Sequence, residues 1–334
     1  MTHQPLTRTL GPDHHHQLPL GPLDVKAAQE RIAGRVRPVV LAPADSDLYP
    51  GRRVTFALEY MQHTGSFKAR GAANLVAAHL QNGTMPEAGI TIASGGNAGL
   101  ACAWAARASG TRATVFVPET APAFKVAKLR GYGAEVRLVG TEYADALAAS
   151  VEHARESGAL LSHAYDNPLI AAGAGTLAAE VLAQLPDADT IMVAVGGGGL
   201  FAGMAAAVAD TPVRVVAVEP THCRALNAAL EAGAPVDVTV NSIAADSLGA
   251  RRVSQTAFEL AQGPNTRSLL VTDEAIVEAR RALWDCRRIV VEHGGATAYA
   301  ALASGAYVPE EDEHVVVVLC GANTDPADLA GASS

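Results

Sequence analysis

The sequence contains few aromatic, charged and cysteine residues. Aromatic side chains make up 4% of its 334 residues, charged side chains make up 18%, and there are 4 cysteines. The cysteines form no CxxC pair and no zinc-ligand spacing, and the chain is too long for a small disulfide-stabilised scaffold; their positions are Cys102, Cys223, Cys286 and Cys320. We therefore expect free thiols in a reducing cytoplasm, and no metal site.

The sequence also lacks an excess of positive charge. Lys and Arg total 25 against 34 for Asp and Glu, so the formal net charge is −9. A basic patch is what nucleic acids and anionic lipids require. We therefore expect neither nucleic acid nor a membrane as a partner.

Two uncharged stretches are long enough to raise the question of a membrane span. Ile191–Ala209 would just cross a bilayer, but its middle is Gly196–Gly199, which is poor helix material. A buried strand, a glycine turn and a buried helix explain this run, and Ile90–Ala106 has the same form. The amino-terminal residues, which include His14–His16, lack the basic and apolar regions of a signal peptide. These features predict a cytoplasmic protein.

Short β-rich runs alternate with Ala-rich helical runs along nearly the whole chain. Strands without a polar face, each followed by a helix, are typical of parallel sheets covered by helices. The expected strands are Arg53–Tyr60, Gly89–Ala93, Ala113–Val117, Glu135–Val139, Thr190–Val195, Arg214–Glu219 and His314–Cys320. The expected helices include Asp24–Val36, Lys68–Asn82, Gly99–Ser109, Ala123–Tyr132, Ala144–Ser157 and Gly173–Leu185. We predict an α/β fold with two open, twisted, parallel-rich sheets and flanking helices.

The first candidate site lies in Thr64–Ala72, where Lys68 begins an expected helix after small residues. A lysine at such a position is usually a solvated charge. Alternatively, a lysine that a small-residue turn places at a domain junction can form a Schiff base with an aldehyde cofactor.

Two glycine-containing loops connect expected strands to expected helices. Ser94–Gly99 presents backbone N–H groups at a helix start, where a carboxylate or phosphate can bind, although Ser94 or Asn97 can equally cap the helix. Four consecutive glycines, Gly196–Gly199, favour a phosphate-binding nest over a merely tight turn.

The second loop also supports a competing interpretation. Gly197, Gly199 and Ala202 fit the pattern G-x-G-x-x-A after a strand, and Glu219 follows at a distance suited to a ribose hydroxyl. This pattern would indicate an NAD-dependent oxidoreductase, but it leaves Lys68 and the Ser94–Gly99 loop unexplained.

A further candidate follows the apolar run Val315–Leu319. Ligands of parallel α/β sheets lie beyond the carboxyl ends of strands, so Cys320 is placed like a ligand contact. A buried cysteine is more often a small hydrophobic residue.

In this order and at these spacings, the four segments resemble the pyridoxal-phosphate (PLP) enzymes of fold type II, the tryptophan synthase β-like fold. Within that group the sequence looks most like the serine/threonine dehydratases. The resemblance extends from about Asp24 to Asn323 and is most specific over Thr64–Ala72. It implies a smaller domain of residues 71–163, which carries the asparagine loop, inserted into a large PLP-binding domain of residues 1–70 and 164–334.

The resemblance implies a role for each segment. Lys68 would bind the cofactor covalently and act as the base, with Phe67 beside it, Asn97 on the ring hydroxyl and Cys320 facing the pyridine nitrogen. The phosphate would lie against Gly196, Gly197, Gly198, Gly199 and Leu200. The substrate carboxylate would bind the loop of Ser94, Gly95, Gly96, Asn97 and Ala98.

Several positions depart from the wider family. Ala98 replaces a histidine, which resembles the catabolic serine-dehydratase branch, as does Cys320 in place of serine. Gly95 occupies the position of the second catalytic serine of racemases, and Thr221–Ala225 lacks the carboxylate of their cation site.

We therefore expect PLP-dependent dehydration and deamination of a hydroxy-amino acid such as L-threonine or L-serine. Alternatives on the same scaffold are 3-hydroxyaspartate dehydration, racemisation and β-replacement. The resemblance also implies a homodimer, and because the chain stops soon after Asn323 we expect no carboxy-terminal regulatory domain.

Overall fold

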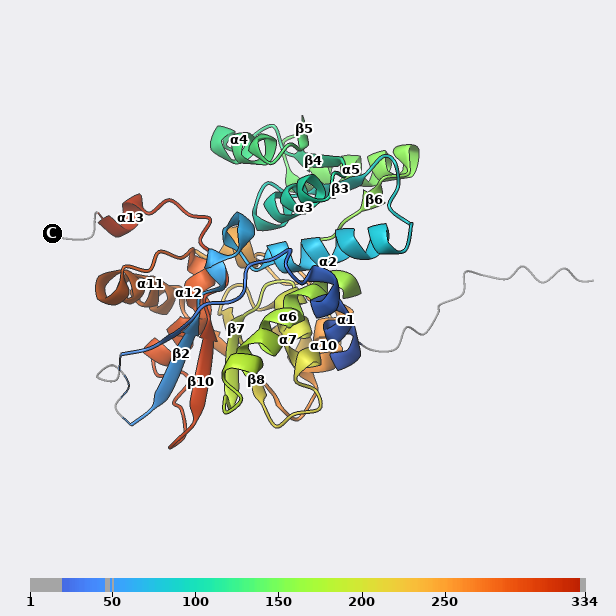
Figure 1. Cartoon of the computed structure of the whole chain (residues 1–334). Coiled ribbons are helices and arrows are strands. Elements are labelled where there is room, and N and C mark those ends of the chain that lie inside the picture. The colour runs from blue at the N-terminus through green and yellow to red at the C-terminus, as the bar shows by residue number, and fades with distance from the viewer. Residues whose placement is uncertain (1–19, 46–48, 50, 331–334) are drawn as a thin grey trace, which may run out of the picture.

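The structure is a computed structural model that describes residues 20–45, 49 and 51–330 (Figure 1). The His14–His16 segment lies outside the described residues. The strands are β1 (Leu41–Pro43), β2 (Arg53–Ala57), β3 (Ile90–Ala93), β4 (Ala113–Val117), β5 (Glu135–Leu138), β6 (Leu160–Leu161), β7 (Thr190–Ala194), β8 (Arg214–Pro220), β9 (Thr266–Val271) and β10 (His314–Val318).

The α-helices alternate with these strands. They are α1 (Pro22–Ile32), α2 (Lys68–Gln81), α3 (Asn97–Ala108), α4 (Ala123–Gly131), α5 (Tyr143–Ser157), α6 (Pro168–Gln184), α7 (Gly199–Ala207), α8 (Ala225–Ala232), α9 (Ala245–Leu248), α10 (Gln255–Ala261), α11 (Asp273–Arg287), α12 (His293–Ala303) and α13 (Ala327–Ala330). Two short 3-10 helices, η1 (Glu59–Met61) and η2 (His63–Gly65), lie between β2 and α2.

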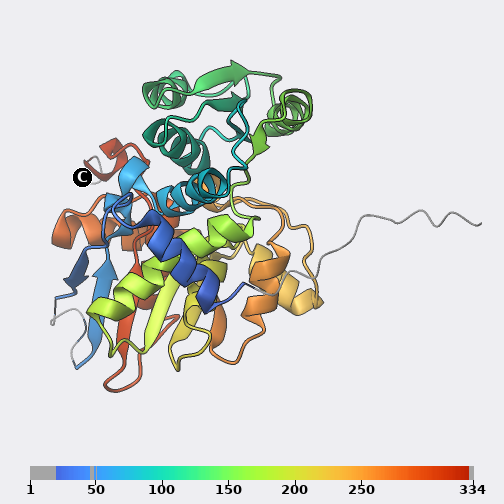
Figure 2. The ribbon, with the colours of Figure 1, turned by 45° about the vertical axis from the view of Figure 1, so that its right-hand side comes forward.

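The strands form two sheets. One has the order β1-β2-β10-β7-β8-β9, in which all neighbours are parallel except the antiparallel edge strand β1. The other has the order β5-β4-β3-β6 and is entirely parallel. All strands of this second sheet come from residues 90–161, and Figure 2 shows them with α3, α4 and α5 as a separate layer.

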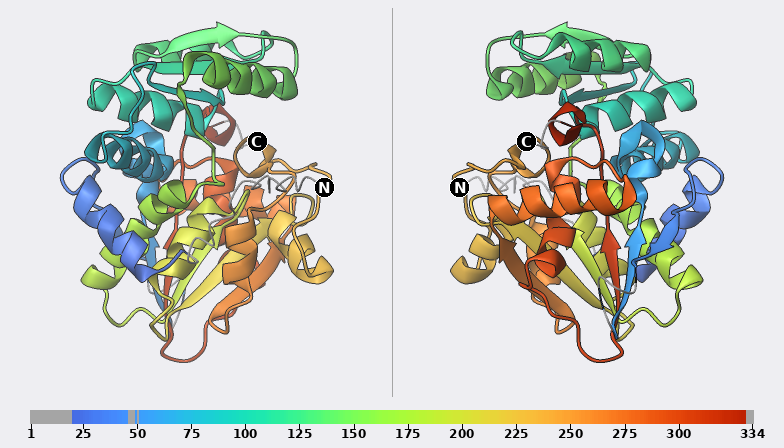
Figure 3. Two further views of the ribbon diagram at one scale, coloured as in Figure 1. Left: turned by 90° about the vertical axis from the view of Figure 1, so that its right-hand side faces the viewer. Right: turned by 90° about the vertical axis from the view of Figure 1, so that its left-hand side faces the viewer.

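Apolar strands explain why helices cover both faces of the larger sheet. Every residue of β7 and β10 is buried, so neither face of the sheet centre can be left to water. Helices α6 and α7 pack together and with α1 on one side, whereas α12 contacts β7 and β8 and packs on α11 (Figure 3). The run Ile191–Ala209 is therefore a buried strand, a turn and a buried helix, as predicted.

Several expected boundaries were wrong. The strand from Arg53 ends at Ala57 instead of continuing to Tyr60, because the chain turns into η1 and buries Glu59. The first helix ends at Ile32 instead of Val36, and Gly34 follows in the left-handed region with φ +70°. Strands β1, β6 and β9 were not predicted.

Within the described residues, no helix is both long enough and apolar enough to cross a membrane.

Candidate active site

The segments identified in the sequence follow neighbouring parallel strands. β10 lies between β2 and β7, so their carboxyl ends meet at one edge of the sheet. The chain leads from β2 to Lys68, from β10 to Cys320, and from β7 to Gly196. This edge is where parallel α/β sheets bind ligands.

Lys68 is the first residue of α2, and the turn before it is tied to the end of β10. Ser66 bridges to Gly321, and the N–H of Phe67 donates to the carbonyl oxygen of Cys320 at 3.0 Å. The turn is strained at Thr64, a non-glycine residue with φ +64°. The path of the chain therefore places Lys68 beside Cys320.

Lys68 as a whole residue is half-buried, and its amine has a neutral partner. Its Nζ donates to the carbonyl oxygen of Ala164 at 3.0 Å and lies 4.7 Å from the ring centre of Phe67. Burial lowers the pKa of Lys68 to about 8, although negative charge on Glu292 acts in the opposite direction. Far more of this amine is therefore unprotonated near neutral pH than of an ordinary lysine, although the protonated form still predominates.

The glycine loop after β7 packs so closely against neighbouring residues that a side chain on Gly197 or Gly198 would collide with them. A Cβ on Gly197 would lie 2.3 Å from the ring of Tyr165, and one on Gly198 would lie 2.4 Å from the Cβ of Ala257. Gly198 also has φ +94° and is the N-cap of α7. The first N–H groups of α7 have no carbonyl of their own helix to bind, so this end of the helix suits an anion.

One cavity brings most of the predicted cofactor contacts together. Its lining comprises Phe67, Lys68, Tyr165, Ala194–Leu200, Ser247, Leu248 and Cys320. Burial raises the pKa of the Cys320 thiol to about 12, so the thiol is neutral.

The asparagine loop lines an adjacent pocket instead. Gly95, Gly96 and Asn97 face that pocket, and the N–H of Gly96 donates to the Ser94 hydroxyl at 3.3 Å. Gly99 permits the sharp turn, because a Cβ there would lie 1.9 Å from the Ser94 carbonyl oxygen. Ser94 therefore orders the loop at the start of α3, and Ala98 lies buried behind it.

A network that sequence analysis did not identify holds the side chain of Asn97 in place. Glu292 Oε1 accepts a hydrogen bond from Asn97 Nδ2 at 2.7 Å, and Glu292 Oε2 accepts one from the backbone N–H of Asn323 at 3.2 Å. Asn323 Nδ2 donates to Asn97 Oδ1 and to the carbonyl oxygen of Thr64, both at 2.7 Å. Burial raises the pKa of Glu292.

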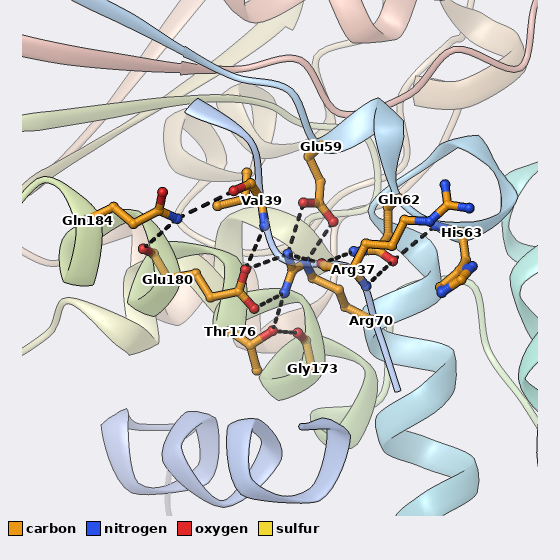
Figure 4. Close-up of polar contacts among 10 residues, drawn as sticks. All are labelled: Arg37, Val39, Glu59, Gln62, His63, Arg70, Gly173, Thr176, Glu180 and Gln184. Carbon is orange, nitrogen blue, oxygen red and sulfur yellow. Dashed lines mark hydrogen bonds and ion pairs between the residues drawn. The ribbon is translucent and has the colours of Figure 1, made fainter. Parts of the chain in front are cut away.

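A buried ion-pair cluster fixes the first turn of α2 (Figure 4). Arg70 is fully buried and donates to both oxygens of Glu59, at 2.7 and 3.1 Å, and to both oxygens of Glu180, at 2.7 and 2.9 Å. Glu180 also accepts the N–H of Val39 at 2.9 Å. The helix that begins with Lys68 is thereby tied to η1 and α6.

These residues fit a cofactor that carries an aldehyde and a phosphate. Lys68 supplies an amine with a lowered pKa, and the glycine loop supplies a helix N-terminus whose N-cap and first residue carry no side chains of their own. Ser66 adds a buried hydroxyl that has no hydrogen-bond partner among the described residues.

The dinucleotide interpretation fits the structure poorly. Glu219 is fully buried, and its two oxygens accept the N–H groups of Leu226 and Asn227, each at 2.8 Å. Its carboxylate therefore caps α8 and cannot reach a ribose hydroxyl.

Comparison with known proteins identifies the family of this chain. Residues 31–321 match the family described as pyridoxal-phosphate dependent enzyme. The chain is 36% identical over 304 residues to an L-threonine ammonia-lyase of Geobacter sulfurreducens, covering 90% of this chain and 75% of that protein. It is 32% identical over 330 residues to a catabolic L-threonine dehydratase of Staphylococcus aureus, covering 97% of this chain and 94% of that protein.

The fold of a solved structure is similar as well. Maize serine racemase superposes with a TM-score of 0.86 at 29% identity, covering 93% of this chain and 95% of that chain. The predicted fold class and the resemblance to PLP enzymes are confirmed. The chain belongs to the family of pyridoxal-phosphate dependent enzymes.

Proposed function

We propose that this enzyme dehydrates and deaminates L-threonine or L-serine, releasing a 2-oxo acid and ammonia. The observation that carries the proposal is the cavity in which Lys68, with its lowered pKa, lies together with the glycine loop and the neutral thiol of Cys320. The names of the Geobacter and Staphylococcus relatives support the same chemistry.

Each predicted site residue has a place in this proposal. Lys68 would hold PLP covalently through its amine, Gly196–Leu200 would hold the phosphate, and Phe67 lies beside Lys68. Asn97 would donate a hydrogen bond to the ring hydroxyl, and the thiol of Cys320 would be the partner of the pyridine nitrogen. When bound, PLP supplies an electron sink for the substrate α-carbon.

Groups of the protein itself bind the substrate and transfer the proton. The N–H groups of Ser94–Ala98 and the start of α3 bind the substrate carboxylate. When it is not bound to the cofactor, the unprotonated Nζ of Lys68 would accept the α-proton, because burial keeps the pKa of this amine near the working pH. The buried thiol of Cys320 is too weak an acid to protonate a pyridine nitrogen, which favours elimination over transamination.

The domain division and assembly belong to the same proposal. Residues 71–163 form the inserted smaller domain and residues 1–70 and 164–334 the larger one, since the strands of the second sheet all lie within 90–161. We also propose that the enzyme is a cytoplasmic homodimer, as the family resemblance implies.

Incubation of the PLP-loaded enzyme with L-threonine or L-serine tests the function. We expect 2-oxobutyrate from threonine or pyruvate from serine, with one equivalent of ammonia. Formation of the D-amino acid without a 2-oxo acid would show a racemase instead, and the absence of both products with either substrate would overturn the proposal.

A further inference from the structure

The pocket beside Asn97 has a charged rim. The loop residues Gly95–Asn97 form one side of the pocket, and Lys125 and Lys128 on α4 form the other. Asp246 on α9 and Asn323 also line the pocket, together with the apolar side chains of Leu100 and Phe124. The lysines are three residues apart in a helix, so they lie on the same face of α4.

An ion pair crosses the mouth of this pocket. Lys125 Nζ lies 2.7 Å from Asp246 Oδ1, which joins the layer of the four-stranded sheet to α9, a helix that contacts α12 beside the larger sheet. The side chain of Lys125 is 25% exposed and that of Asp246 is 71% exposed. Both charges therefore line the same pocket as Gly95–Asn97, the loop at which the proposed function places the substrate.

The pairing leaves one positive charge on the rim. Asp246 neutralises Lys125, whereas Lys128 contacts a neutral group, the amide oxygen of Asn323, at 3.5 Å. Glu292 accepts a hydrogen bond from Asn97, and its pKa is raised mainly by burial and to a smaller extent by the charge of Asp246. The proposed function binds the substrate α-carboxylate at the N–H groups of Ser94–Ala98, so a second carboxylate in this pocket would be exposed to the negative charge of Asp246.

We propose that the Lys125–Asp246 pair determines substrate specificity by favouring amino acids with an uncharged side chain over those with a second carboxylate. This inference rests on the proposed function, in which the pocket beside Asn97 receives the substrate. Asp246 repels the second carboxylate and occupies Lys125, which would otherwise attract it.

Binding of L-asparagine and L-aspartate tests the inference, because these ligands differ in charge and hardly in shape. Dissociation constants are measured by calorimetry on the PLP-loaded enzyme. We expect the wild type to bind asparagine more tightly. Asp246→Asn keeps a hydrogen-bond partner for Lys125 and should shift the ratio of the two constants roughly fivefold towards aspartate, the size expected for a partly screened charge.

Lys125→Gln should shift the same ratio in the opposite direction, because it leaves Asp246 uncompensated. Raising the salt concentration to about 0.5 M should shrink both shifts. Glu152→Gln is the matched control: it removes an exposed carboxylate that pairs with Arg155 on α5, outside the pocket lining, and should leave the ratio unchanged.

The signs separate a charge effect from a structural one. A looser pocket would weaken the binding of both ligands in both variants. The inference instead requires the ratio of the two dissociation constants to shift in opposite directions in the two variants. Shifts in the same direction, no shift beyond twofold, a shift in the control, or no binding of either ligand to the wild type would overturn it. These ligands need not react, so failure of the wild type to dehydrate threonine and serine would contradict the proposed function separately.

Discussion

Glu292 orients the side-chain amide of Asn97. It accepts a hydrogen bond from Asn97 Nδ2 at 2.7 Å, while Asn97 Oδ1 accepts one from Asn323 at 2.7 Å. With an acceptor on one side and a donor on the other, the amide has one preferred orientation. One N–H of Asn97 is then left for an acceptor on the cofactor ring.

This relationship predicts that Glu292→Gln weakens PLP binding. A carboxylate accepts from both Asn97 and the N–H of Asn323, but a glutamine amide offers one acceptor, so a buried N–H loses its partner. A loss of roughly 1–3 kcal/mol corresponds to about a fivefold to 150-fold higher Kd. Equilibrium dialysis of PLP against the apoprotein measures this change.

Glu219→Gln is the control for that experiment. Glu219 is another buried acid that accepts two backbone N–H groups, but it caps α8 away from both pockets. We expect it to lower the stability without changing the Kd of PLP. Equal changes in Kd for the two variants would show that Glu292 acts only through stability.

The lowered pKa of Lys68 predicts unusual reactivity of its amine. In the apoprotein, trace labelling by a neutral acylating reagent should rise with pH through a midpoint near 8, compared with about 10.4 for an ordinary lysine. Mass spectrometry of the peptide containing Lys68 follows the labelling across a pH series. A midpoint at the ordinary lysine value would contradict the burial argument.

The same pKa shift has a consequence for stability. Between about pH 8 and the ordinary lysine pKa of about 10.4, the unfolded chain holds a proton at Lys68 that the folded chain has lost. This group therefore contributes a rise in folding stability as pH increases through that window. Lys68→Met should remove its contribution.

The Arg70 cluster predicts a large loss of stability on truncation. Arg70→Met leaves the buried carboxylate of Glu59 without its partner and should cost about 3–5 kcal/mol in urea unfolding. The double variant Arg70→Met, Glu59→Leu should recover part of that loss, since it removes the uncompensated charge as well. A loss in the double variant at least as large as in the single one would contradict this account. Arg155→Met, which breaks an exposed pair, serves as the control and should change little.

The neutral thiol of Cys320 predicts which side reaction a substitution produces. Cys320→Asp places an acid opposite the proposed position of the pyridine nitrogen, which strengthens the electron sink and should increase pyridoxamine phosphate formation relative to 2-oxo acid release. Cys320→Ser keeps a neutral group and should leave the product ratio unchanged. Faster elimination without added transamination in the Asp variant would refute this role for Cys320.

Local sequence patterns were enough to predict the alternating strands and helices of the fold. The buried strands β7 and β10 are apolar runs next to glycine turns, and Lys68 begins its helix where the pattern placed it. Strand β9 was missed because it alternates incompletely, with partly exposed positions along most of its length. Strands of two or three residues, such as β1 and β6, carry too little pattern to detect.

The long-range contacts of the site could not be predicted in this way. Glu292 and Asn97 are 195 residues apart, and Tyr165 reaches the glycine loop from another segment. The sequence indicates that Asn323 follows a buried strand, but not that its amide contacts Asn97 and Thr64. Such pairings depend on how the two sheets are placed, which local periodicity does not encode.

Borohydride reduction of the PLP-loaded enzyme, followed by peptide mapping, tests the central claim most directly. Reduction makes a lysine–cofactor bond permanent, so the modified residue is identified by mass. The account predicts a single phosphopyridoxyl group on Lys68. A label on another lysine, or a PLP-loaded protein that acquires no label, would contradict it.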